Sequence, residues 1–284
     1  MPTNYEMQFE GCCEAFAASY EVSNLPAMRE VERTVLGCDY GGTSWTTSTQ
    51  ATQIIEMLGL RQGLKLLDIG AGSGWPGLFL ADTSGCDVTL LDLPVSALAK
   101  AIKRARSDGI DDRVDAIAAS GSAMPIRSAC FDAISHSDVL CCMPEKIEML
   151  KECRRVATDR AKMLFSVIAV TRNLSEADHR RAVDAGPPFV DAPNSYVDLL
   201  EECGWRLKKH IDVTAEHRRS LSVLVKAFDD SAELSDALGD DVVSQARKRR
   251  QEQIAVIDAG LLVREILVAT ASDNEASQIP LVDL

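Results

Sequence analysis

Short apolar runs alternate with longer amphipathic stretches through the middle of the chain. Buried strands are predicted at five of these runs, which read KLLDI, CDVTLL, RVDAIAA, DAISH and AKMLFSVIAV. Apolar residues at helical spacing fill intervals between them, from Pro76 onward, over Val95–Ser107 and over Glu145–Val156. Strands that alternate with helices are typical of a parallel sheet joined by helical crossovers. The pattern therefore predicts an α/β fold.

Further patterns flank this core. Apolar positions at helical spacing predict additional helices over residues 5–20, 26–36, 47–58, 175–184 and 196–203. The runs WRLKKHIDV and GLLVREILVAT predict a sixth and a seventh strand. We expect these two strands to pair as an antiparallel hairpin at the sheet edge, with helical segments inserted between them.

A glycine-rich loop follows the first predicted strand. Leu66–Gly74 reads LLDIGAGSG, so an acid ends the strand and three alternate glycines come directly after it. Glycines at 70, 72 and 74 allow positive φ angles and let a ligand approach main-chain N–H groups that a Cβ would block. The loop therefore predicts a ligand site at the carboxyl end of this strand.

Two kinds of ligand are compatible with the sequence of this loop. Gly72, Gly74 and Gly77 also fit the dinucleotide pattern G-x-G-x-x-G, and Asp92 lies downstream where it could bind a ribose. The charge of Asp68 separates the two, because it opposes a pyrophosphate on the helix N-terminus and favours the ammonium and sulfonium of S-adenosylmethionine. The loop thus predicts S-adenosylmethionine, with an NAD-dependent dehydrogenase as the alternative.

Segments around the loop extend this interpretation. The chain resembles the class I S-adenosylmethionine-dependent methyltransferases of the small-molecule type, over roughly residues 45–170. The likeness is carried by LLDIGAGSG together with GGTSWTTSTQATQIIEMLGL, VTLLDLP and SGSAMPIRSACFDAISHSDVLCCMPEKIEMLKECRRV. The resemblance implies a Rossmann-like, seven-stranded and mostly parallel sheet with an antiparallel edge hairpin. It also implies helices on both faces, an N-terminal helical cap and a helical insertion before the last strand.

The chain length suits one domain. Its 284 residues, 46% of them hydrophobic, can bury one substantial core. We expect an N-terminal helical cap (1–60), a cofactor-binding core (61–170), a substrate lid (171–204), an edge hairpin with a helical insertion (205–270) and a polar tail (271–284).

The loop and the resemblance together imply a set of site residues. Ser122 stands where many relatives carry an Asp that binds the adenine amino group, and a hydroxyl accepts that bond more weakly. The residues expected to bind the cofactor are Trp45, Thr46, Asp68, Gly70, Gly72, Gly74, Asp92, Leu93, Ser122, Ala123 and His136.

Methyl transfer from a sulfonium is an in-line displacement, so positioning in a dry site supplies most of the acceleration. An acceptor N or O nucleophile that must lose a proton benefits from a base, and His136 is the candidate catalytic residue. We expect His179 and Tyr196 to bind the substrate, a small molecule.

Charge and composition limit the classes of molecule that the protein is expected to bind. The net charge of −13 opposes contact with nucleic acid and with anionic membranes. SHSD at the fourth strand, in place of an N-P-P-[YF] sequence, disfavours methylation of nucleic-acid bases. Without a leader or a long apolar run, the chain is expected to be cytoplasmic, and a monomer or a homodimer.

Cysteine spacing indicates no metal site. The chain has nine cysteines and no C-x-x-C. A thiophilic acceptor of the arsenite type, bound by Cys38, Cys141 and Cys142, stays as a minor alternative. A second alternative is a module that binds S-adenosylmethionine and has weak turnover. A protein acceptor is disfavoured, because the expected lid would enclose a pocket too small for one.

Overall fold

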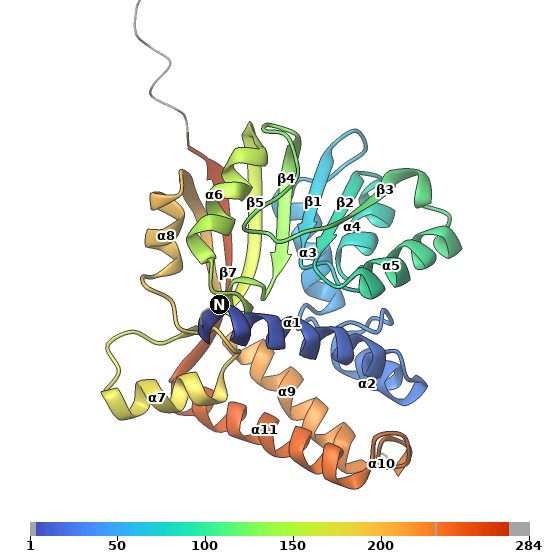
Figure 1. Cartoon of the computed structure of the whole chain (residues 1–284), viewed down its shortest axis with the longest axis vertical. Coiled ribbons are helices and arrows are strands. Elements are labelled where there is room, and N and C mark those ends of the chain that lie inside the picture. The colour runs from blue at the N-terminus through green and yellow to red at the C-terminus, as the bar shows by residue number, and fades with distance from the viewer. Residues whose placement is uncertain (1–3, 231, 273–284) are drawn as a thin grey trace, which may run out of the picture.

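The computed structural model describes residues 4–230 and 232–272, so most of the expected tail at 271–284 lies outside the described residues. Seven described strands form one sheet in the order β3-β2-β1-β4-β5-β7-β6 (Figure 1). Their bounds are β1 Lys65–Ile69, β2 Asp87–Asp92, β3 Val114–Ala118, β4 Phe131–Ser137, β5 Ala157–Val170, β6 Trp205–Asp212 and β7 Leu262–Ala271. Pairs among β1 to β5 are parallel, whereas β7 runs antiparallel to β5 and β6. The predicted mostly parallel sheet with an antiparallel edge pair is confirmed.

Helices cover both faces of the sheet because neighbouring strand residues point to opposite sides. Leu66 packs with α3 (Ser48–Leu58), α4 (Gly77–Ser84) and α5 (Val95–Asp108). Leu67 packs on the other face with α6 (Lys146–Val156) and α8 (Tyr196–Glu202). Strands buried on both faces explain the nearly continuous apolar runs of the sequence.

The remaining helices form a layer beyond the strand ends. In Figure 1 this layer lies below the sheet, on the side to which the arrowhead of β4 points. Val31, Leu224, Leu234 and Val243 pack together within it. Its helices are α1 Asn4–Ser23, α2 Pro26–Leu36, α7 Glu176–Ala185, α9 Thr214–Asp230, α10 Ala232–Leu238 and α11 Asp240–Asp258, and short 3₁₀ turns occur elsewhere at Asp111–Arg113 and Leu140–Cys142. None of the helices in the described part of the chain has the length and apolarity needed to cross a membrane.

Helix α3 begins with a capping box beside the strand ends. The Thr47 side chain accepts from the Gln50 N–H at 3.2 Å, and the Gln50 side chain accepts from the Thr47 N–H at 3.3 Å. Two N–H groups that the helix leaves without partners are thereby satisfied. This start places Trp45 and Thr46 at the carboxyl edge of the sheet.

Candidate functional site

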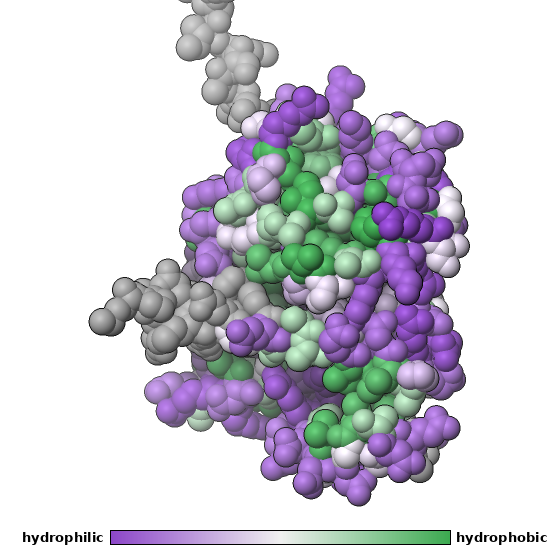
Figure 2. Space-filling view, turned by 45° about the vertical axis from the view of Figure 1, so that its right-hand side comes forward, coloured by the Kyte–Doolittle hydropathy of each residue, from purple (hydrophilic) through white to green (hydrophobic). Residues whose placement is uncertain are grey.

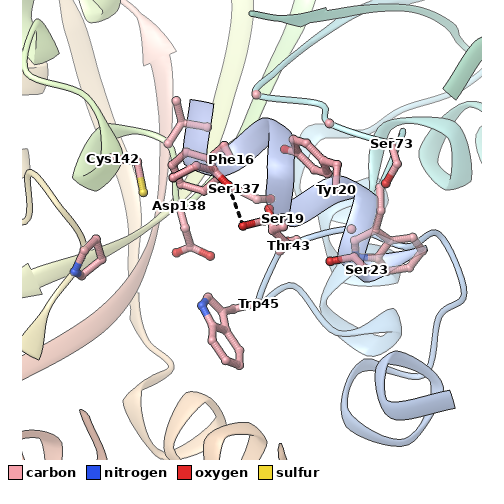
Figure 3. A pocket seen from close by; sticks show the side chains of 18 of the residues that line it. Phe16, Ser19, Tyr20, Ser23, Thr43, Trp45, Ser73, Ser137, Asp138 and Cys142 are labelled. Carbon is pink, nitrogen blue, oxygen red and sulfur yellow. Dashed lines mark hydrogen bonds between the residues drawn. The ribbon is translucent and has the colours of Figure 1, made fainter. Parts of the chain in front are cut away.

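A cavity of about 900 Å³ separates the strand ends from the helical layer. This volume lies near the upper end of the range of small-molecule sites, so it can hold two small ligands in contact. The ends of β1, β2 and β4 line one side, and α1, α2, α9 and α11 line the other. Figure 3 shows Asp138, Cys142 and Trp45 on one side of the view and Tyr20 and Ser73 on the other.

The glycine loop has the backbone that the sequence predicts. Gly70, Gly72 and Gly74 all have positive φ, and the first two line the cavity. A Cβ on Gly72 would lie 2.5 Å from the Tyr20 hydroxyl, and one on Gly74 would lie 2.5 Å from a Leu78 methyl group. Gly74 therefore serves close packing of the loop on α4, and Gly72 leaves room for the Tyr20 side chain.

The N–H groups of these glycines are already used within the protein. Gly70 donates to the Leu91 carbonyl at 2.7 Å, Gly74 donates to the Ala71 carbonyl at 2.8 Å, and Gly72 donates to Asp92. The loop thus offers a ligand bare backbone for close approach, in place of the free N–H groups expected from the sequence. The hydroxyl of Ser73 is the exception in this loop, because it lines the cavity and is buried without a hydrogen-bond partner among the described residues.

Asp92 connects this loop to the end of β2. Its Oδ2 accepts from the Gly72 N–H at 2.7 Å, and its Oδ1 accepts from the Leu93 N–H at 2.7 Å. Burial raises the pKa of the Asp92 carboxyl, and the two N–H groups oppose that change. Both Asp92 and Leu93 line the cavity, so a carboxylate with spare lone pairs stands where ribose hydroxyls could donate.

Asp68 lies beneath the loop and is only 1% exposed. Its Oδ1 accepts from the Ser135 hydroxyl at 2.6 Å, and its Oδ2 accepts from the Gly77 N–H at 3.1 Å. Burial raises the pKa of this carboxyl to about 7. Asp68 is absent from the cavity wall, so it positions the loop and the start of α4 from below.

Of the two residues expected to bind the cofactor before α3, one lines the cavity and the other does not. Trp45 lines the cavity, whereas Thr46 is buried behind the wall. The Thr46 hydroxyl donates to the Ser137 hydroxyl at 3.0 Å, and its carbonyl accepts from the Trp75 indole N–H at 2.8 Å. Thr46 therefore holds the cavity wall together from behind.

The loop after β3 reaches the cavity two residues earlier than expected. Ser120 and Gly121 line the cavity, but Ser122 and Ala123 do not. The Ser120 and Ser122 hydroxyls lie 2.8 Å apart, so Ser122 acts through Ser120. The serine pair in the sequence marks this loop, but only the fold shows which of the two residues lines the cavity.

The structure does not bring His136, His179 and Tyr196 to the cavity wall. His136 stacks on Phe165 in the core at 4.6 Å, and Tyr196 meets the edge of the same ring at 6.1 Å. Burial lowers the pKa of His136 to about 3, so its ring is neutral. His179 lies on exposed α7, 3.2 Å from Asp191.

Asp138 is a cavity residue that the sequence analysis missed. It follows β4 with φ of 57°, a left-handed conformation that is uncommon outside glycine. Arg264 of β7 fixes its carboxylate through Nε at 3.0 Å and Nη2 at 2.9 Å. No motif signals this pair, because its members come together only when β7 inserts beside β5.

The helical layer supplies mainly apolar side chains to the cavity. They are Met28, Val31, Leu224, Phe228, Leu238, Val242, Val243 and Ala246. Val22, Leu93 and Val242 are also exposed by more than a third, so the mouth has an apolar rim. On the face drawn in Figure 2, hydrophobic side chains form separate patches within a mostly hydrophilic surface.

The three cysteines of the thiophilic alternative do not converge. Cys141 and Cys142 line the cavity, but Cys38 does not, and its thiol lies 3.6 Å from Glu32 Oε1. The described residues contain no group of three or more His, Cys, Asp or Glu side chains that could hold a metal ion.

Comparisons with known proteins agree with this geometry. A family model described as a methyltransferase domain matches residues 67–165. Methyltransferase GfsG of Streptomyces halstedii is 29% identical over 69% of this chain and 71% of its own length. The 27-O-demethylrifamycin SV methyltransferase of Amycolatopsis mediterranei is 27% identical over 67% of this chain and 72% of its own length.

A solved structure supports the fold over a longer stretch. Phosphoethanolamine N-methyltransferase 2 of Haemonchus contortus, in complex with S-adenosyl-L-methionine, has a TM-score of 0.73. The match covers 92% of this chain and 60% of that chain at 15% identity. The helical layer is thus part of a shared fold together with the sheet.

Proposed function

Because the chain is a class I S-adenosylmethionine-dependent methyltransferase, we propose that it methylates a hydroxyl oxygen of an apolar small molecule. The apolar half of the cavity supports this acceptor class, since Val31, Leu224 and Phe228 can bury a hydrocarbon skeleton. A relative named for 27-O-demethylrifamycin SV supports oxygen as the acceptor atom. An amine on an equally apolar molecule is the alternative.

We assign the cofactor to the strand side of the cavity. Asp92 would accept from the ribose hydroxyls, and Leu93 and Ser120 would contact the adenine. The loop segment 70–73, which lines the cavity, would receive the methionine end, with the unpartnered hydroxyl of Ser73 beside it. Asp68 would act from beneath, by holding the loop.

In this arrangement the protein contributes position rather than a dedicated base, and the proton that the acceptor hydroxyl loses would pass to water at the cavity mouth. The bound cofactor supplies a methyl group already activated by the sulfonium. The helical layer excludes water and holds the acceptor against the strand side, which favours in-line attack. Proton transfer by His136 has no support, because its neutral ring lies in the core. The carboxylate of Asp138 is already engaged, because it accepts two hydrogen bonds from the Arg264 guanidinium.

A panel of acceptors tests this proposal. The enzyme is incubated with S-adenosylmethionine and either hydroxylated terpenoids and polyketides or amines of matched size, and mass spectrometry detects the added methyl group. We expect product from the hydroxylated compounds. Product only from amines, or only from small polar metabolites, would contradict the proposal.

A variant of the helical layer provides the matched control. Phe228→Asp places a charge in the apolar half, away from the strand side. We expect this variant to lose turnover while its affinity for S-adenosylmethionine stays within about threefold of the wild type.

A further inference from the structure

The cavity wall contains a cation without an acidic partner. Arg250 of α11 lines the cavity, and its guanidinium carbon lies 5.2 Å from the centre of the Trp45 ring. Its Nη1 donates to the Gln253 side-chain oxygen at 2.8 Å. Burial lowers the pKa of Arg250 to about 10, with a further effect from Arg249, so the group stays charged at neutral pH.

The neighbouring cations of the same helix are paired. Arg247 forms an ion pair with Asp229 at 2.7 Å, and Lys248 forms one with Glu252 at 4.0 Å. Within residues 4–230 and 232–272, neither Arg249 nor Arg250 forms an ion pair. The unpaired arginines are therefore the ones that line the cavity.

The acids of the cavity wall form no ion pair with these arginines in the described part of the chain, and each accepts hydrogen bonds from other groups. Glu32 accepts from the N–H groups of residues 40, 41 and 42. Asp92 accepts from two N–H groups, and Asp138 is held by Arg264. A partly buried guanidinium that lacks an acidic partner among the described residues is only partly compensated, so an anion that enters this cavity gains by pairing with Arg250.

One side of α11 arranges these groups in order. Val242, Val243 and Ala246 face the cavity first, and Arg249 and Arg250 follow one turn later. Eight residues of helix separate Val242 from Arg250, which corresponds to about 12 Å. The wall thus presents an apolar stretch that ends in a positive charge.

We infer that the acceptor is an amphipathic anion, whose apolar body lies along Val242–Ala246 and whose carboxylate pairs with Arg250. This inference rests on the proposed function and names its substrate class more narrowly. The net charge of −13 repels anions from the surface at large, so a specific cation inside the cavity is needed to bind one. Arg250 belongs to the helical layer and not to the glycine loop, which favours the acceptor over the cofactor's own carboxylate.

Binding of two matched probes tests the inference. Decanoate and decanol have the same hydrocarbon chain and differ in charge. Each is titrated into the complex of the full chain with S-adenosylhomocysteine, and binding is followed by calorimetry. We expect decanoate to bind at least about tenfold more tightly than decanol, as for a charge-assisted hydrogen bond. Arg250→Gln should reduce this preference to less than about threefold, whereas Lys248→Gln on the same helix should leave it unchanged.

The other results would overturn the inference in distinguishable ways. Equal binding of both probes to the wild type would remove the carboxylate site but leave the apolar acceptor in place. Absence of binding by both probes would contradict the apolar acceptor half as well. A loss of S-adenosylhomocysteine affinity in Arg250→Gln, with the preference for decanoate retained, would assign the arginine to the cofactor.

Discussion

Asp138 and Arg264 form a two-pronged ion pair that joins the loop after β4 to strand β7, between residues 126 positions apart. Arg264 is 1% exposed and also donates to Gln50 at 3.2 Å and Ser166 at 3.0 Å. The pair fixes one wall of the cavity to the antiparallel edge of the sheet. Its removal should therefore affect both stability and the site.

Arg264→Met leaves Asp138 as an unpaired buried charge. We expect the free energy of unfolding, measured by urea titration, to fall by about 3–5 kcal/mol. Asp138→Asn added to Arg264→Met should recover part of that loss, because the uncompensated charge disappears. A loss below about 1 kcal/mol in the single variant would contradict the proposed role.

Asp92→Ala removes the acceptor that connects the glycine loop with β2. We expect the dissociation constant for S-adenosylmethionine, measured by calorimetry, to rise at least about tenfold, because a charged hydrogen-bond acceptor is lost. Asp87→Ala at the exposed amino end of the same strand is the control and should bind normally. Equal affinities of both variants would argue against a cofactor contact at Asp92.

The raised pKa of Asp68 makes stability depend on pH. The folded carboxyl has a pKa of about 7 against 3.8 in the reference state, so between these values the folded protein holds a proton that the unfolded chain releases. Its contribution to stability is full below pH 3.8 and is lost as the pH rises through about 7. Asp68→Asn should flatten the fall in unfolding free energy between about pH 5 and 7. Identical slopes in both proteins would show that Asp68 does not titrate in this range.

His136→Leu distinguishes a core residue from a catalytic one. Both ring nitrogens of His136 are buried, and neither has a hydrogen-bond partner among the residues that the structure describes, so an apolar side chain of similar size removes an unfavourable burial. We expect turnover and cofactor affinity within about threefold of the wild type. A fall in turnover that grows at lower pH would instead indicate proton transfer by this ring.

The sequence predicts the sheet and its order of elements because each buried strand must be apolar. It also predicts the glycine loop, since glycine is the residue that adopts the positive φ angles at residues 70, 72 and 74 most readily. The sequence does not predict contacts between residues that lie far apart along the chain. His136 and Ser122 stand at plausible positions along the chain, but neither lines the cavity, because His136 stacks on Phe165 in the core.

The sequence also does not predict how the helical layer packs on the strand ends. The runs at residues 219–228 and 240–259 read as helical segments, and their spacing does not indicate which of their sides faces the strand ends. Arg250 lies in the basic run Arg247–Arg250 and resembles a solvated helix surface until the fold turns it toward Trp45. The placement of α11 on α9 decides which of these cations lines the cavity.

A crystal structure of the protein with S-adenosylhomocysteine would decide whether the cofactor binds between Asp92 and the helical layer. We expect the ribose hydroxyls on Asp92, the backbone of Gly72 against the ligand, and the sulfur facing the apolar side chains of α9 and α11. A ligand bound elsewhere, or a sulfur directed away from the helical layer, would contradict the account.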